Sequence, residues 1–282
     1  MIKRFDTCLE YKSGFTHSGV FHADEVFCTA MLKMIDPDFV IRRGFKAPQD
    51  EDILVYDLTG RPEFDHHYKP LETRENGVPY AAFGKIWRCF AADAFGKREA
   101  EKLDSTLVQE IDAVDNGVDG AKSNISRFIH EMNPIWNHYG EDNEEQFWKA
   151  VEYATIILRR EIESARAVIE AEECVDKGID GQLLILDRYC PWIAHVVNNY
   201  PDVMFSIFPS PRGGYSMQVV PVVVDTTTPR LDVPEEWKGY SKESGKDAPF
   251  NGMTFCHVSG FLSNFQTKEQ AIAAAKYIMN RR

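Results

Sequence analysis

Short runs of β-branched and aromatic residues alternate with longer segments of helical period through the first half of the chain. Continuous apolar runs predict strands, and apolar positions three and four residues apart predict helices. This alternation is typical of a parallel sheet covered by helices, so we expect an α/β domain here. The predicted strands are Gly14–His17, Phe39–Arg43 and Ile53–Tyr56, and the predicted helices are Asp24–Ile35, Ala81–Phe95, Glu99–Asp112 and Ile125–Glu131.

The pattern changes twice further along the chain. The alternately charged segment Asn143–Glu173 predicts a long, partly exposed helix, and Thr226–Phe250 is rich in Pro, Gly and charge and predicts a surface loop. The remaining predicted elements are strands at Leu183–Leu186, Val203–Phe208, Tyr215–Val220 and Met253–Cys256, with helices at Trp192–Asn199 and Lys268–Met279. We therefore expect an α/β domain over residues 1–142, a helical connector over 143–177, and a second, smaller α/β domain over 178–282.

Composition is ordinary for a globular protein, with 44% hydrophobic and 27% charged residues among 282. The net charge of -12 argues against long-range attraction to nucleic acid or to an anionic membrane. The charge is uneven, because residues 1–150 hold 18 basic and 27 acidic side chains whereas residues 176–282 hold 11 of each. The first half therefore carries most of the excess carboxylate.

Nothing in the sequence predicts a membrane protein. No apolar run approaches the roughly 20 residues of a spanning helix, and the first residues lack the apolar core of a signal peptide. The six cysteines form no CxxC pair, which favours free thiols in a reducing compartment. We expect a cytoplasmic protein with no membrane partner.

Histidine and aspartate gather in four segments where predicted strands or helices end. The segments are Thr16–Glu25 with His17, His22 and Asp24, the strand end at Asp57, the tripeptide Asp65-His66-His67, and the helix end with Asp112 and Asp115. Open α/β sheets place their ligand crevice at the carboxyl ends of strands. Taken alone, each segment is better explained as a helix cap, a turn or a solvated loop. The four together favour one site.

Imidazole and carboxylate without thiolate suit hard or borderline divalent ions. Several carboxylates that can bridge favour two ions about 3.5–4 Å apart, an arrangement that clamps both oxygens in a phosphoryl transfer. The pattern therefore predicts a two-ion metal site with Mn²⁺, and with Mg²⁺, Fe²⁺ or Zn²⁺ as alternatives.

At this point the sequence resembles a known family. The strings THSGVFHADE, YDLTGRPEFDHHY, FGKIW, IDAVDNG, PSPRGGY and CHVSGFLSNFQTKEQA are similar to the melanocyte-proliferating-gene (Myg-type) branch of the DHH phosphoesterase superfamily, from about Gly14 to Ala275. The first superfamily motif is HxxxDxD, whereas this chain has His17, His22 and Asp24 with one more residue. That departure is typical of the Myg-type branch.

The resemblance implies roles for these residues. His17 and His22 would bind one ion, Asp24 and His66 the other, and Asp57 would bridge them. The fourth motif ligand would be Asp112 or Asp115, with Asp115 favoured by analogy. In the DHH tripeptide, Asp65 and His67 would be the catalytic pair, and His67 would face the substrate phosphate.

The family implies phosphodiester hydrolysis by a water that two metal ions activate, with members that act as 3′-to-5′ RNA exonucleases. The net charge of -12 predicts weak affinity for long duplexes, so we expect short or single-stranded RNA or oligonucleotides as substrates. Two alternatives stay open: a phosphatase or phosphodiesterase on small molecules such as pyrophosphate or dinucleotides, and a non-catalytic metal-binding interaction protein. The oligomeric state also stays open, a homodimer included.

The second half would hold the substrate. The resemblance implies phosphate binding by Arg212, Gly213 and Gly214, although a plain hairpin turn also explains this string. It likewise implies substrate contacts from His257, Ser259 and Gly260. Relatives commonly carry a glycine pair after Ser-Gly-Phe, which Leu262-Ser263-Asn264 replaces here. Three histidines without acids at useful spacing are expected to be structural: His130, His138 and His195.

Overall fold

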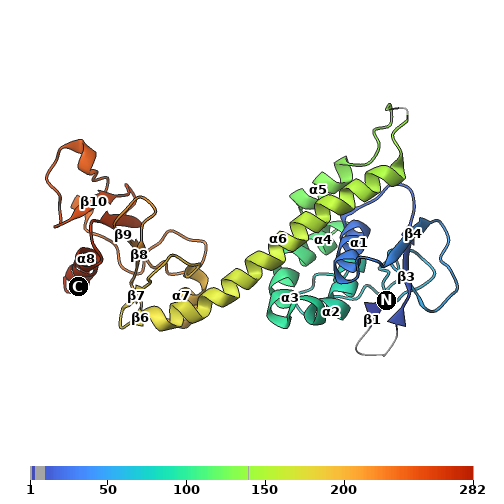
Figure 1. Cartoon of the computed structure of the whole chain (residues 1–282), viewed down its shortest axis with the longest axis horizontal. Helices are drawn as coiled ribbons and strands as arrows, with labels where there is room; N and C mark the ends of the chain where they lie inside the picture. Colours follow the sequence, from blue (N-terminus) through green and yellow to red (C-terminus); the bar gives the residue numbers. More distant parts are fainter. Residues whose placement is uncertain (1, 4–9, 139, 282) are drawn as a thin grey trace. The chain divides into compact units, whose positions relative to one another are not determined.

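The computed structural model describes residues 2–3, 10–138 and 140–281 (Figure 1). The chain divides into two compact units, Met1–Arg166 and Ala167–Arg282, and each has its own sheet and hydrophobic core. The boundary lies inside helix α6, Asn143–Gly178 (Figure 1). The predicted long helix is therefore confirmed, and it continues five residues beyond the predicted end at Glu173.

The first unit is built on a three-stranded parallel sheet. Strand β3 (Ser13–His17) lies between β4 (Val40–Gly44) and β5 (Ile53–Val55). A separate antiparallel pair joins β1 (Ile2–Lys3) to β2 (Glu10–Tyr11). The predicted parallel α/β arrangement is confirmed, and the carboxyl ends of β3 and β5 lie side by side at one edge of the sheet.

Helices cover this sheet and form most of the core. The segments after α1 (Ala23–Ile35) are α2 (Ala82–Phe95), α3 (Lys97–Leu103), the π-helical turn η1 (Asp104–Val108), α4 (Gln109–Asp115) and α5 (Asn124–Glu131). Helix α1 is buried from Ala23 to Leu32, because helices pack on it from several sides. Where one helix was expected over Glu99–Asp112, the structure has three consecutive segments, since the π turn inserts an extra residue.

The second unit is a six-stranded sheet in the order β10-β11-β9-β8-β7-β6 with helix α8 (Lys268–Met279) against it. Its strands are β6 (Ile179–Asp180), β7 (Leu183–Ile185), β8 (Phe205–Pro209), β9 (Tyr215–Val219), β10 (Met253–Cys256) and β11 (Leu262–Phe265). Its other helices are α7 (Ile193–Asn199) and the 3₁₀ turns η2 (Glu235–Trp237) and η3 (Lys242–Ser244). Only β7 and β8 pair in parallel.

A smaller α/β unit is thus confirmed, but β6 and β11 were not predicted. Strand β11 has only four residues, two of them the polar Ser263 and Asn264, and it pairs with β9 and β10. Polar residues in so short a strand leave no apolar run to detect.

Two expectations concern the whole chain. Five cysteines are free thiols, namely Cys28, Cys89, Cys174, Cys190 and Cys256, whereas Cys8 lies outside the described residues. Among the helices in the described part of the chain, none combines the length and apolar character needed to span a membrane.

Candidate metal centre

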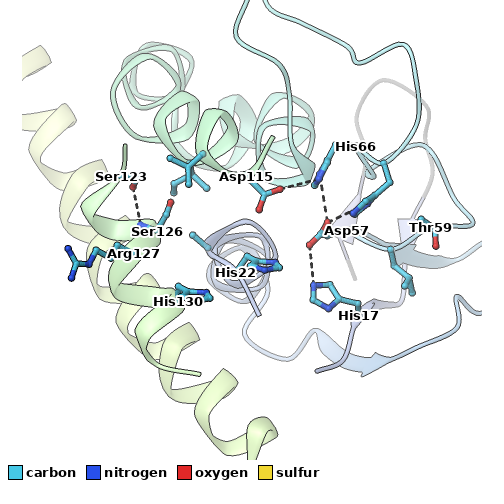
Figure 2. A pocket seen from close by; sticks show the side chains of 15 residues that line it. His17, His22, Asp57, Thr59, His66, Asp115, Ser123, Ser126, Arg127 and His130 are labelled. Atoms are coloured by element: carbon cyan, nitrogen blue, oxygen red, sulfur yellow. Dashed lines mark hydrogen bonds and ion pairs between the residues drawn. The ribbon is translucent and has the colours of Figure 1, made fainter. Parts of the chain in front are cut away.

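Four separate segments of the first unit meet at the carboxyl edge of its sheet, around a cavity of about 670 Å³ (Figure 2). His17 ends β3, and His22 precedes the first turn of α1. Asp57 follows β5 and has a φ of 46°, a left-handed conformation that aspartate tolerates better than most residues. Asp115 ends α4. The edge of the sheet therefore brings together side chains up to 98 positions apart in the sequence.

His17 is the centre of the first group. Its Nε2 lies 2.9 Å from Oε1 of Glu25 and 3.3 Å from Oδ2 of Asp57. His22 completes a set of four side chains whose ligand atoms all lie within 4.8 Å of one another. We did not predict Glu25 as a member, because a glutamate in the first turn of a helix is usually a cap. It does cap α1, since its carboxylate accepts the backbone N–H of His22.

His66 is the centre of the second group. Its Nε2 lies 3.1 Å from Oδ2 of Asp115, and its Nδ1 lies 3.7 Å from both Oδ2 of Asp24 and Oδ1 of Asp57. Figure 2 shows this chain of contacts, from Asp115 to His66, from His66 to Asp57 and from Asp57 to His17. Asp57 contacts the central histidines of both groups, so it is placed where a shared ligand would be needed.

His67 has a different environment from His66. Its ring stacks on His66 at 4.4 Å, about half of its side chain is exposed, and it lines the cavity. Its Nδ1 lies 2.5 Å from Oδ1 of the fully buried Asp65. When Nδ1–H donates to that carboxylate, Nε2 is the ring atom left for a molecule in the cavity.

The cluster contains more carboxylates than imidazoles, and this excess raises the pKa values of several of its groups. Burial alone would lower the pKa of His17, but hydrogen bonds to Asp57 and Glu25 outweigh burial and raise it to about 10. Burial and the neighbouring carboxylates raise the pKa of Asp115 to about 8, and the same two causes raise the pKa of Asp24 well above its usual range. A cation beside these carboxylates would favour their ionised forms.

Three buried atoms of the cluster have no hydrogen-bond partner among the described residues: Oδ1 of Asp57, Oδ2 of Asp65 and Nδ1 of His66. Buried polar atoms normally make a hydrogen bond, so three such atoms without one from the described residues indicate that another group binds there. Burial lowers the pKa of His66, which favours the neutral imidazole that a metal requires. Orphaned donor atoms, neutral imidazole and several carboxylates together fit divalent cations.

Asp24 and Asp112 also hold the start of α2. The carboxylate of Asp24 accepts the backbone N–H groups of Ala82 and Phe83 at 2.9 and 2.7 Å, and Asp112 accepts that of Gly84 at 3.0 Å. Three of the donors that a helix start leaves unpaired are thereby satisfied by two buried acids. A Cβ at position 84 would lie 1.9 Å from Oδ2 of Asp112, so only glycine fits there.

This arrangement separates the two candidates for the fourth motif. Asp112 is fully buried, pairs with Arg74 at 2.8 Å, and lies outside the groups that could hold an ion. Asp115 belongs to the group formed with Asp24 and His66. Of the two, the structure brings only Asp115 to the cavity.

Several residues of the string FGKIW make hydrogen bonds that hold this unit together. Besides Gly84, its Lys85 is nearly buried and donates from Nζ to the backbone carbonyl of Asp65 at 2.6 Å. Trp87 donates from Nε1 to the carbonyl of Ala100. Lys85 therefore anchors the segment that carries Asp65-His66-His67, a role that no sequence pattern indicated.

Of the predicted substrate residues, Arg212 and His257 line a separate cavity of about 720 Å³ in the second unit, together with Tyr189, Phe208 and Phe255, whereas Gly214, Ser259 and Gly260 do not line it. Gly213 and Gly214 have positive φ in the turn between β8 and β9, and a Cβ on Gly214 would lie 2.1 Å from the carbonyl of Phe265. The hairpin explanation thus accounts for both glycines. Ser259 donates its backbone N–H to Nδ1 of His257, and Gly260 has a φ of 78°.

The three histidines expected to be structural differ from one another. His138 pairs with Glu141 at 3.1 Å, and His195 pairs with Asp176 at 2.7 Å. His130 is exposed on α5 and lines the cavity of the first unit. Its position beside the metal-ligand cluster depends on how α5 packs against α1, which sequence spacing does not show.

Comparison with known proteins finds similarity along nearly the whole chain. The family model MYG1_exonuc, described as "Uncharacterised protein family (UPF0160)", matches residues 15–279. The "MYG1 protein" of Dictyostelium discoideum is 26% identical over 94% of this chain and 95% of its own length. The "MYG1 exonuclease" of Homo sapiens is 26% identical over 95% of this chain and 85% of its own length, and that of Mus musculus is 25% identical over 95% and 84%. No solved structure matches.

Proposed function

The chain belongs to the MYG1 family, UPF0160, and from that premise we propose that it is a metal-dependent phosphodiester hydrolase of the DHH type. We propose further that it removes nucleotides from the 3′ end of short or single-stranded RNA. One observation carries the proposal: ligand groups from four segments meet beside one cavity, where three buried donor atoms have no hydrogen-bond partner in the described part of the chain. The printed name of the human and mouse relatives, MYG1 exonuclease, supports the reaction class.

The donor groups divide naturally between two ions. His17 and His22 with Asp57 would hold one, and Asp24, His66 and Asp115 would hold the other, with Asp57 shared between them. Bound divalent ions lower the pKa of water toward neutrality and offset negative charge at the reacting phosphate. Mn²⁺ suits this donor set, as do Mg²⁺, Fe²⁺ and Zn²⁺ to differing degrees.

The chain's own residues position the proton transfer. Hydrolysis joins a water oxygen to phosphorus and breaks the bond from phosphorus to the 3′ oxygen of the preceding nucleotide, and that oxygen takes up a proton. Asp65 orients the His67 ring through Nδ1, so Nε2 can polarise a phosphoryl oxygen or protonate the leaving oxygen. Lys85 holds the backbone of Asp65 and so fixes this pair.

The test is release of 5′-mononucleotides from short RNA in Mn²⁺ by wild type, Asp57→Asn and a control, Asp93→Asn. Asparagine keeps the shape of Asp57 and tolerates its left-handed backbone, but it removes the shared charge. Asp93 is exposed on α2, away from the cavity. We expect Asp57→Asn to lose about 10³-fold in rate, since metal catalysis contributes several kcal/mol, and Asp93→Asn to keep wild-type activity.

Three other results of these assays would change the proposed function. Undiminished turnover by Asp57→Asn would refute the two-ion mechanism. Hydrolysis of pyrophosphate but not of oligonucleotides would make the protein a small-molecule phosphatase. Metal binding without hydrolysis of either substrate class would make it a non-catalytic metal-binding protein.

A further inference from the structure

The cavity of the first unit has a second polar wall, opposite the metal-ligand cluster. It is formed by helix α5 and the residue before it, through Ser123, Ser126, Arg127 and His130. These positions are spaced i, i+3, i+4 and i+7, which places them on one face of the helix. Figure 2 shows Ser126 and His130 across from Asp115 and His22. Neither the metal ligands nor the proposed proton transfer uses this face.

Ser126 is the most informative residue of the wall. It is 9% exposed, and its Oγ has no hydrogen-bond partner among the described residues. Its backbone N–H already donates to Oγ of Ser123, the cap of α5, so the fold uses its main chain and leaves its hydroxyl unused. A buried hydroxyl without a partner is unfavourable, and a molecule in the cavity that accepted a hydrogen bond from Oγ would relieve that cost.

Two nitrogen-bearing side chains extend this wall. Arg127 is the one lysine or arginine among the described residues that line the cavity, and His130 presents an exposed imidazole. Nε of Arg127 pairs with Glu131 at 2.9 Å, its side chain is 79% exposed, and Figure 2 shows it extending outward from the helix. A hydroxyl, an imidazole and a guanidinium are donors suited to phosphate oxygens.

The cavity therefore has two ends of opposite character, one rich in carboxylates that would hold cations and one that offers donors to an anion. Ala23, Ile111 and Val114 also line it and give it an apolar surface. Its volume of about 670 Å³ exceeds what a single phosphate group needs.

We propose that Ser126, His130 and Arg127 bind the phosphate group adjacent to the scissile one. This inference rests on the proposed function and narrows its substrate class to phosphodiesters that carry a second phosphate one nucleotide away. The apolar surface from Ala23, Ile111 and Val114 would contact the intervening nucleoside.

The test compares two dinucleotides that differ by one group, 5′-phosphorylated pApA and its 5′-hydroxyl counterpart ApA. We expect wild type to prefer pApA in kcat/KM by about tenfold or more, since a hydrogen bond to a charged group is worth at least that factor. Ser126→Ala should remove most of the preference through KM for pApA and leave the kinetics with ApA unchanged. Arg127→Gln should reduce the preference in the same direction.

The matched control is Asn124→Ala, which changes an exposed residue of the same helix that does not line the cavity. Because Oγ of Ser126 makes no hydrogen bond to any residue that the structure describes, Ser126→Ala should unfold at the wild-type temperature. A wild-type preference for pApA that Ser126→Ala retains, or no wild-type preference at all, would overturn the inference while the proposed function stands.

If wild type hydrolyses neither dinucleotide, the kinetic comparison cannot be made, and the proposed function fails if wild type also releases no mononucleotides from short RNA. Calorimetric titration of the Asp57→Asn protein with pApA and with ApA then decides the inference. Tighter binding of pApA that Ser126→Ala abolishes supports the phosphate subsite, and equal binding of both dinucleotides refutes it.

Discussion

Gly84→Ala should destabilise the protein although alanine is the better helix former, because Gly84 packs against a buried acid beside the candidate metal centre. In most helices this change is stabilising by up to about 1 kcal/mol, because alanine is the better helix former. Here the new Cβ would lie 1.9 Å from Oδ2 of Asp112 and 2.8 Å from Nη2 of Arg74. Asp112 is fully buried and held by both Arg74 and the Gly84 N–H, so it cannot move aside without losing a partner.

The magnitude follows from two costs and one gain. Loss of the hydrogen bond from Gly84 to the carboxylate costs about 1.5–3 kcal/mol. Overpacking of a buried site costs about 1–3 kcal/mol more. Set against a gain of about 1 kcal/mol in propensity, the net destabilisation should be about 1.5–5 kcal/mol, which in a unit of this size lowers Tm by roughly 3–20 °C.

Thermal unfolding and Mn²⁺ titration measure both consequences. Because Asp24 caps the same helix start, displacement of α2 should also weaken metal binding by tenfold or more. Ala92→Gly is the control, since it changes an exposed position of α2 and should cost only about 1 kcal/mol with metal affinity unchanged. A Gly84→Ala protein as stable as wild type, with wild-type metal affinity, would show that the reasoning is wrong.

Two further predictions concern the acids of the cluster. Asp115→Asn should weaken Mn²⁺ binding more than tenfold with little loss of stability. Asp112→Asn should instead lower Tm, because it weakens the pairing with Arg74. If calorimetry and thermal unfolding gave the opposite ranking, Asp112 would be the metal ligand and Asp115 the structural residue. Metal binding must also displace protons from His17 and Asp115, whose pKa values are about 10 and about 8, so affinity should rise as pH rises from 6 to 8. Calorimetry in buffers of different ionisation enthalpy should count at least two protons released near pH 7, because Asp24 also has a raised pKa, and an affinity independent of pH would contradict this.

The fold was predictable where local pattern decides it. The strand Ser13–His17 and the helix Ala23–Ile35 follow from an apolar run and from helical period, and each begins within one residue of the predicted start, Gly14 and Asp24. Strand Leu262–Phe265 was missed because its place between two partners depends on residues nearly 50 positions away. The π turn Asp104–Val108 was missed because nothing in its composition distinguishes it from an α-helix.

The candidate site was predictable for a different reason. His17 and Asp57 end neighbouring parallel strands, and such ends meet at one edge of a sheet. Glu25, Lys85 and His130 were not predicted for this site, because each has an ordinary local explanation as a cap, an exposed charge or a solvated helix residue. Their contribution appears only when α1, α2 and α5 are packed around the same cavity.

Asp24 connects the stability of this unit to its chemistry. One of its oxygens, Oδ2, accepts the N–H of Ala82 and also lies 3.7 Å from His66. The start of α2 favours the ionised carboxylate, whereas burial and the nearby acids raise its pKa. A cation at His66 and Asp115 would shift this balance toward the ionised form and so strengthen both hydrogen bonds from α2. Metal binding and the attachment of α2 should therefore stabilise each other. Part of the net charge of -12 thus comes from buried acids that can both bind a cation and cap a helix.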